Sequence, residues 1–104
     1  MRESSVEDHL IQALARLGLA CVKFIPDNRA GMPDRLVLLP GERVLWVETK
    51  TDGGRLSELQ KLRARELRRA GQRVAHVWTT VEADALVAQL EGEFNLSRIS
   101  DRTS

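Results

Sequence analysis

The stretch GMPDRLVLLPGERVLWVETK, residues 31–50, holds two short apolar runs, 36–39 and 44–47, joined by Pro-Gly-Glu-Arg. Turn residues between two such runs are typical of a β-hairpin. Asp34 precedes the first run, and Glu48 and Lys50 follow the second. The fold is therefore expected to contain a hairpin whose two strands carry these charged residues.

Helix and strand patterns flank this hairpin on both sides, and apolar spacing sets their expected bounds. In chain order these are a helix over 4–18, a strand over 20–25, hairpin strands over 36–39 and 44–47, a helix over 57–70, a strand over 73–78 and a helix over 81–90. The order αβββαβα, with a helix crossing between the hairpin and the last strand, predicts a mixed sheet covered by helices. We expect a single α/β domain.

Short polar motifs mark the expected ends of the helices. A Ser followed three residues later by Glu or Gln forms a capping box, and a Gly ends a helix readily. The expected N-terminal caps are Ser4 with Glu7, Ser57 with Gln60, and Thr80; the expected stops are Gly18 and Gly71.

A length of 104 residues, with 42% apolar and 30% charged residues, suits one compact domain with one core. We expect this domain over 1–92, followed by a flexible polar tail over 93–104. No apolar run is long enough to span a membrane, and the first residues do not resemble a signal peptide. Cys21 is the only cysteine, which suits a reducing compartment. We therefore expect a soluble cytoplasmic protein without a membrane partner.

Basic residues concentrate in one segment although the net charge is only +1. From Arg55 to Arg73 there are seven basic residues and two acidic ones, and thirteen of the sixteen basic residues in the chain are arginine. The guanidinium fork of arginine matches phosphate oxygens well, so this segment is a candidate surface for nucleic acid. A solvated helix face is the alternative interpretation.

Two carboxylates and a lysine occupy positions that we expect to form one site. Side chains alternate along a strand, so Glu48 and Lys50 share a face. Asp34 joins that face only in the right hairpin register. A three-residue loop of Gly41, Glu42 and Arg43 would pair Leu36 with Glu48 and achieve this, as would a bulge with the same effect. The alternative interpretation involves no active site. Glu48 and Lys50 would then form an exposed ion pair at a strand end, and Asp34 would be a turn residue after Pro33.

Glu7 and Gln60 are further candidates on the two neighbouring helices. Glu7 lies within the arc of apolar residues of its helix, where a carboxylate needs a cation as partner. The alternative is that Glu7 only interacts with the positive end of the helix dipole in the first turn. Gln60 lies at the edge of the apolar face of its helix and could point at the site as well as cap the helix. Arg63 and Glu66 interrupt the same apolar face without an evident reason beyond an ion pair or a subunit contact.

The carboxylates Glu7, Asp34 and Glu48 would offer hard oxygen ligands without cysteine or a histidine pair. Such a donor set favours Mg²⁺ or Mn²⁺ over zinc or copper, and a divalent ion suits phosphoryl chemistry. Lys50 would orient the nucleophile or stabilise negative charge in the transition state. The chain has no phosphate-binding loop for a nucleoside triphosphate.

The pattern of Pro33-Asp34 followed by Glu48-Thr49-Lys50 resembles the PD-(D/E)xK nuclease superfamily, whose core has the order αβββαβ. The wider string is similar to the VRR-NUC domain over about residues 5–90; it consists of Glu7, Lys23-Phe24, Gly31-Met32-Pro33-Asp34-Arg35, Glu48-Thr49-Lys50 and Gln60. This resemblance implies a restriction-endonuclease-like core, and a stand-alone domain of the kind found in bacteriophages.

The resemblance also implies roles for individual residues. Glu7, Asp34 and Glu48 would be metal ligands, with the main-chain carbonyl of Thr49 completing the set, Lys50 would be the catalytic lysine, and Gln60 would support the site. Candidate DNA contacts are Lys23 and Arg35 from the resemblance, and Arg55, Lys61, Arg65, Arg68 and Arg69 from the basic helix.

The function expected from these features is a Mg²⁺- or Mn²⁺-dependent endonuclease that cuts branched DNA. Similar stand-alone domains resolve Holliday junctions as homodimers, and the two-fold symmetry of a four-way junction suits a dimer. The alternatives are a DNA-binding subunit that does not cut DNA, and a flap or restriction-type nuclease.

Overall fold

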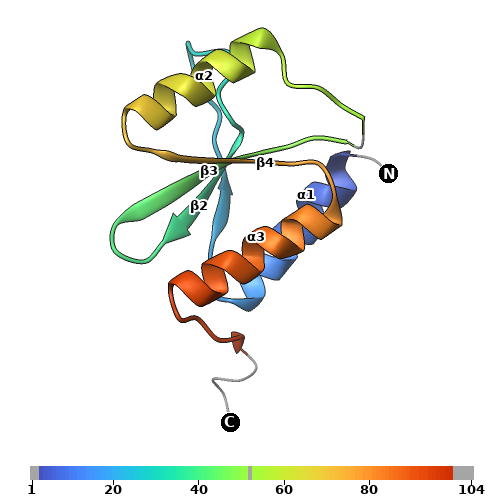
Figure 1. The fold of residues 1–104 in the computed structure, drawn as a ribbon, viewed down its shortest axis with the longest axis vertical. Coiled ribbons are helices and arrows are strands. Elements are labelled where there is room, and N and C mark those ends of the chain that lie inside the picture. The colour runs from blue at the N-terminus through green and yellow to red at the C-terminus, as the bar shows by residue number, and fades with distance from the viewer. Residues whose placement is uncertain (1–2, 52, 100–104) are drawn as a thin grey trace.

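The computed structural model describes residues 3–51 and 53–99 and contains three helices and four strands within them. In chain order these are α1 (Glu3–Arg16), β1 (Cys21–Lys23), β2 (Arg35–Leu39), β3 (Arg43–Thr49), α2 (Glu58–Arg69), β4 (Arg73–Val77) and α3 (Thr80–Glu93). The predicted order αβββαβα is confirmed. Helix α2 covers one face of the sheet, and α1 and α3 lie side by side on the other (Figure 1). None of the described helices is long and apolar enough to cross a membrane.

The sheet has the order β1-β2-β3-β4 and is mixed, as predicted. Strand β2 pairs antiparallel with both β1 and β3, whereas β4 pairs parallel with β3. The parallel pairing follows from the crossover through α2, which carries the chain across one face of the sheet before β4 begins. The open end of the β2–β3 hairpin therefore lies between β1 on one side and β4 on the other.

The register of the hairpin differs from the predicted one by two residues. Leu36 pairs with Trp46, not with Glu48, because the loop consists of Pro40, Gly41 and Glu42 and the pairing resumes at Arg43. Gly41 and Glu42 both have positive φ, of 79° and 62°. A two-residue shift preserves the alternation of side chains. The prediction that Asp34 falls on the same face as Glu48 is consistent with this register.

The helix ends follow local sequence signals in most places. The capping box of Ser57 with Gln60 is present at α2, and Gly18 and Gly71 follow α1 and α2 with positive φ. The predicted cap of α3 was one residue late: Thr79 is the N-cap and shares its box with Glu82.

The predicted capping box of Ser4 with Glu7 is wrong, because Ser4 already lies inside α1. The strand predicted over 20–25 is also shorter, from Cys21 to Lys23.

The main core lies between the sheet and the pair α1 and α3. It consists of apolar side chains from the inner face of these helices and from alternate positions of β2, β3 and β4. Helix α3 extends beyond its predicted end to Glu93, and Phe94 and Leu96 pack against the same core. The expected tail over 93–104 therefore begins within packed structure, and its residues 100–104 lie outside the described part of the chain.

Candidate active site

Asp34 directly precedes β2 and Glu48 lies near the end of β3, so both belong to the open end of the β2–β3 hairpin. Arg35 pairs with Val47, so the next step of the same register sets Asp34 opposite Glu48. The backbone of Asp34 is still paired with the chain that follows β1, because the Phe24 amide donates to the Asp34 carbonyl oxygen at 2.8 Å. The register therefore brings two carboxylates from adjacent strands to the α2 side of the sheet.

Lys50 belongs to the same face of β3 and contacts Glu48. The Lys50 ammonium lies 3.9 Å from Glu48 Oε2, and Glu48 is only 7% exposed. The Lys50 amide donates to the Val77 carbonyl oxygen at 2.9 Å, which continues the parallel β3–β4 ladder. A buried carboxylate is costly unless a cation or a hydrogen bond compensates it, and Lys50 is one such cation.

Asp34 carries a buried oxygen atom that has no hydrogen-bond partner among the described residues. This atom, Oδ1, is shielded from solvent although it belongs to a carboxylate. Buried polar atoms without partners are rare in folded proteins and often mark a site for an ion or a ligand. Asp34 is thus available to bind a cation at the hairpin end.

The loop that leads to Asp34 is fastened to α2. A Cβ atom on Gly31 would lie 2.6 Å from Leu59 Cγ and 3.0 Å from the Leu59 carbonyl carbon, so only glycine fits there, and its φ is +86°. Arg63 Nε donates to the Ala30 carbonyl oxygen at 3.0 Å. Helix α2 thereby sets the path of the chain three residues before Asp34.

Arg63 and Glu66, which the sequence left unexplained, form the contacts that hold the 29–31 loop against α2. Arg63 Nη1 donates to Glu66 Oε1 at 3.0 Å, and Arg29 in the loop donates to the same oxygen atom. The sequence showed the (i, i+3) spacing of Arg63 and Glu66. It held no signal that Arg29, more than thirty residues earlier, would join them.

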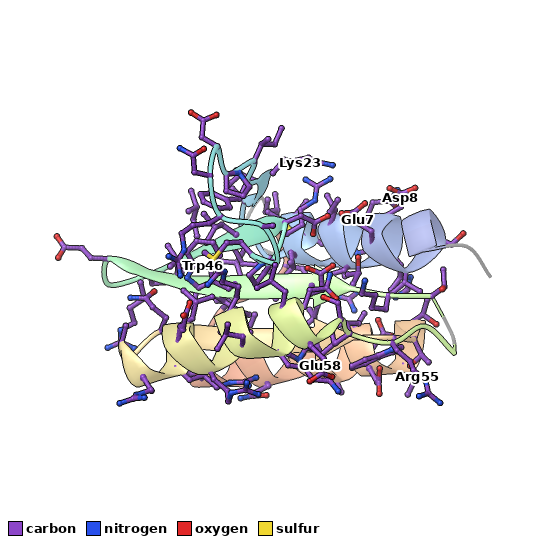
Figure 2. All side chains as sticks on the ribbon, turned by 90° about the horizontal axis from the view of Figure 1, so that it is seen from above. Glu7, Asp8, Lys23, Trp46, Arg55 and Glu58 are labelled. Atoms are coloured by element: carbon purple, nitrogen blue, oxygen red, sulfur yellow. The ribbon has the colours of Figure 1, made fainter. Side chains whose placement is uncertain are left out.

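Glu7 binds Arg35 on the other side of the sheet. Arg35 Nε donates to Glu7 Oε2 at 2.8 Å, and the two side chains are 17% and 18% exposed. The neighbouring residue Asp8, labelled beside Glu7 on α1 in Figure 2, is exposed. Glu7 was predicted to have a cationic partner, and that partner is Arg35. The role of Glu7 as a metal ligand stays a prediction.

The charges of this corner act on Cys21 as well. Burial raises the pKa of the Cys21 thiol, the nearby Arg35 guanidinium lowers it, and the Glu7 and Asp34 carboxylates raise it. The pKa of Arg35 is raised, mainly by the hydrogen bond with Glu7 and further by the negative charges of Glu7 and Asp34.

Gln60 uses its side-chain oxygen to cap α2. Gln60 Oε1 accepts from the Ser57 amide at 2.8 Å, and the Gln60 amide donates to Ser57 Oγ at 3.0 Å. The capping role is confirmed, and a direct role at the site stays a prediction. Gln60 fixes the first turn of α2, which is also the turn that contacts Gly31 through Leu59.

The residues at the hairpin end fit a hard divalent cation in chemistry but do not form a finished cluster. Carboxylate oxygens are the ligands that Mg²⁺ and Mn²⁺ prefer, and Asp34 Oδ1 is buried without a partner. Within residues 3–51 and 53–99, no three His, Cys, Asp or Glu side chains gather closely enough to hold a metal ion. The roles of Asp34 and Glu48 as metal ligands stay predictions.

Most of this chain is similar to a known domain family. Residues 2–80 match the VRR-NUC domain. The chain belongs to the VRR-NUC domain family. A solved structure described as a VRR_NUC domain superposes with a TM-score of 0.76 at 26% sequence identity, covering 83% of this chain and 94% of that one.

A phage protein is also similar to this VRR-NUC domain. "Putative nuclease p44" of Acyrthosiphon pisum secondary endosymbiont phage 1 is 42% identical over 53 residues, which are 51% of this chain. The match spans 57% of the length of the phage protein.

The candidate DNA contacts of the VRR-NUC domain are spread over more than one side. Lys23 and Arg55 project from opposite sides of the molecule in Figure 2. Arg55, Arg65 and Arg69 are exposed. Three other candidates have partners in the protein: Arg35 binds Glu7, Lys61 binds Glu58, and Arg68 donates to the Val74 carbonyl oxygen. All seven roles stay predictions, and the exposed arginines are the better supported.

Proposed function

We propose that this VRR-NUC domain is a metal-dependent endodeoxyribonuclease that hydrolyses phosphodiester bonds in branched DNA, with the four-way Holliday junction as its substrate. Family membership and the name of the phage relative support nuclease activity. The observation that carries the proposal is the β2–β3 register, which, continued by one pair, would set Asp34 opposite Glu48 on the face that bears Lys50.

The cofactor is proposed to be Mg²⁺ or Mn²⁺, held by Asp34 and Glu48. Glu7 and the main-chain carbonyl of Thr49 are the further ligands that the family resemblance implies, and Glu7 would first have to separate from Arg35. When bound, such an ion polarises a phosphodiester oxygen and lowers the pKa of a water molecule.

The protein's own residues would bind and orient the substrate. The Lys50 ammonium is proposed to stabilise the negative charge that develops on the phosphate, or to hold the attacking water by a hydrogen bond. Exposed basic side chains of α2 and of the segment before it would hold the DNA backbone. The fastening of the 29–31 loop to α2 would keep Asp34 in place while DNA binds to that helix.

A cleavage assay on defined DNA substrates tests this function. The wild-type protein should cut a labelled four-way junction in Mg²⁺ or Mn²⁺, should cut a flap and a linear duplex more slowly, and should be inactive in EDTA. Asp34→Asn should lose cleavage because it removes one negative ligand. Asp27→Asn, an exposed residue of the same loop, is the matched control and should keep full activity.

Two alternative functions predict different results in the same assay. A protein that binds the junction in Ca²⁺ but never cuts it in Mg²⁺ or Mn²⁺ would be a non-catalytic DNA-binding subunit. Faster cleavage of the flap or of the duplex than of the junction would indicate a flap or restriction-type nuclease.

A homodimer is proposed as the active form in the cytoplasm of a bacterium or a phage-infected cell. A four-way junction has two-fold symmetry and needs two cuts, which a two-fold dimer supplies. Light scattering after size-exclusion chromatography should give about twice the chain mass of 11.7 kDa. A monomer at the concentrations used for cleavage would contradict the dimeric mechanism.

A further inference from the structure

A shallow pocket of about 420 Å³ lies beside the candidate site. It lies where the chain enters α2 and where β4 ends, and it is lined by Gly54, Arg55, Leu56, Glu58, Lys61 and Trp78. Arg55 and Glu58 both lie along the lower side of the molecule in Figure 2. None of the roles described above uses Trp78 or this pocket as a whole.

The β3–β4 ladder connects the pocket to Lys50. Thr49 pairs with Val77, and the Lys50 amide donates to the Val77 carbonyl oxygen at 2.9 Å. Trp78 is the residue directly after β4, so the next step of the same register sets it beside Lys50. Because side chains alternate, Lys50 and Trp78 fall on the same face as Glu48. The pocket therefore lies on the face of the sheet that carries the candidate site, next in register to Lys50.

The indole ring of Trp78 is held in place and has its polar atom satisfied. Trp78 Nε1 donates to the Gly54 carbonyl oxygen at 2.6 Å. His76 meets the ring edge to face, with centroids 6.1 Å apart. With its N–H group used, the ring can offer a ligand only its apolar π surface. Trp78 is thus suited to stacking.

Two cations accompany this aromatic surface. Arg55 is exposed, and Lys61 pairs with Glu58 at 3.0 Å, with 49% and 88% of the two side chains exposed. An exposed ion pair of this kind contributes little stability, so Lys61 can exchange Glu58 for a phosphate at small cost. An aromatic ring beside basic side chains is the combination that binds single-stranded nucleic acid.

We propose that this pocket binds an unpaired nucleotide next to the phosphodiester that is cut. The base stacks on Trp78, and Arg55 and Lys61 contact its phosphates. In continuous duplex DNA both faces of each base are covered by neighbouring bases, so only a base at a branch point or in a single strand can reach the indole. The inference rests on the proposed function and adds the reason why branched DNA would be preferred over duplex.

Tryptophan fluorescence of single-tryptophan proteins tests the pocket without any cleavage. Trp46→Phe leaves Trp78 as the only tryptophan, and Trp78→Phe leaves Trp46. Trp46 lies on the same sheet face but packs edge to face on Phe24 and donates to Gln72, away from the pocket. In EDTA, a short oligothymidine should quench Trp78 strongly and Trp46 little, and a blunt duplex should quench neither comparably.

The affinity for labelled DNA is a second measurement, and its signal comes from the label on the DNA and not from a tryptophan of the protein. Trp78→Leu should weaken binding of a fluorescent single-stranded oligonucleotide by roughly five- to a hundredfold, the loss of one stacked base. Affinity for blunt duplex should change less than about twofold, and circular dichroism should show the wild-type helix content. An equal loss for both DNAs, or no loss for the single strand, would overturn the inference.

The two proposals fail in different ways. A protein whose Trp78 responds to single-stranded DNA, but which cuts nothing in Mg²⁺ or Mn²⁺, retains the nucleotide pocket and loses the nuclease function. A protein that cuts the junction normally after Trp78→Leu, with unchanged binding of single strands, retains the nuclease function and loses the pocket.

Discussion

Lys50 lies two residues beyond Glu48 on the same face of β3, with its ammonium 3.9 Å from the Glu48 carboxylate. Lys50→Ala should abolish cleavage of the junction, because the developing charge on the phosphate loses its nearest cation. Junction binding in Ca²⁺ should change little, since the exposed cations of α2 remain. Cleavage rate and binding affinity are measured on the same preparation.

Lys61→Ala serves as the comparison for Lys50→Ala, because it removes an ammonium from an exposed ion pair. It should weaken DNA binding and leave cleavage at saturating enzyme close to normal. If Lys50→Ala lost binding and cleavage to the same extent, the catalytic role of Lys50 would be wrong.

Glu7 and Arg35 form a largely shielded ion pair that joins α1 to β2. Glu7→Gln and Arg35→Gln should each lower the free energy of unfolding by about 1–3 kcal/mol, since each leaves a shielded partner without its counter-charge. The double variant should lose less than the sum of the two. Urea denaturation measures all three.

Asp8→Asn provides the control for Glu7→Gln, because Asp8 is the next residue but is exposed. It should change the free energy of unfolding by no more than about 0.5 kcal/mol. Strictly additive losses in the double variant would show that Glu7 and Arg35 do not stabilise one another.

At the scale of elements, the contact between the 26–34 loop and α2 determines where Asp34 lies. Gly31→Ala would force a Cβ atom against the backbone of Leu59, so either the loop or the helix must shift. The variant should lose about 1–3 kcal/mol more stability than Gly71→Ala. Cleavage should also fall, because the shift displaces Asp34. Thermal unfolding and junction cleavage check both effects.

Gly71→Ala is the matched control because Gly71 has nearly the same φ, +82° against +86°, and no atom within 4 Å of the added Cβ. Both variants strain a left-handed backbone, and only Gly31→Ala adds a steric clash. Equal loss of stability in the two would mean that the contact with Leu59 is soft and does not position the loop.

On the scale of the whole molecule, charge is distributed unevenly over the two sides of the sheet. Arg65 and Arg69 are exposed on α2, and replacing both with serine should weaken junction binding. The slope of log affinity against log salt should become shallower by roughly 1.8, since each phosphate that the protein no longer neutralises reduces it by about 0.9. Binding titrations at several salt concentrations measure this slope.

The control pair Arg16→Ser and Arg98→Ser removes the same charge from the side of α1 and α3. These residues line a hollow between the two helices, across the sheet from α2 (Figure 1). Their replacement should leave the salt slope within error of the wild type. If this pair lowered the slope instead of the α2 pair, the DNA would bind on the opposite side of the sheet.

Local sequence patterns were enough to predict the order of elements, most helix ends and the identity of the residues at the hairpin end. These features depend on short-range physics: apolar periodicity, capping boxes such as Ser57 with Gln60, and glycines such as Gly71 that accept positive φ. The alternation of β3 likewise put Glu48 and Lys50 on one face before any partner strand was known.

The hairpin register, the partner of Glu7 and the contacts that hold the loop before Asp34 could not be predicted from these local patterns. Each depends on contacts between residues far apart in the chain. Glu7 meets Arg35 across 28 positions, and Arg63 meets Ala30 across 33. The turn geometry shifted the register by two residues and preserved the shared face. The site survived this error because side-chain alternation has a period of two, whereas no local pattern specifies which distant group will satisfy a buried charge.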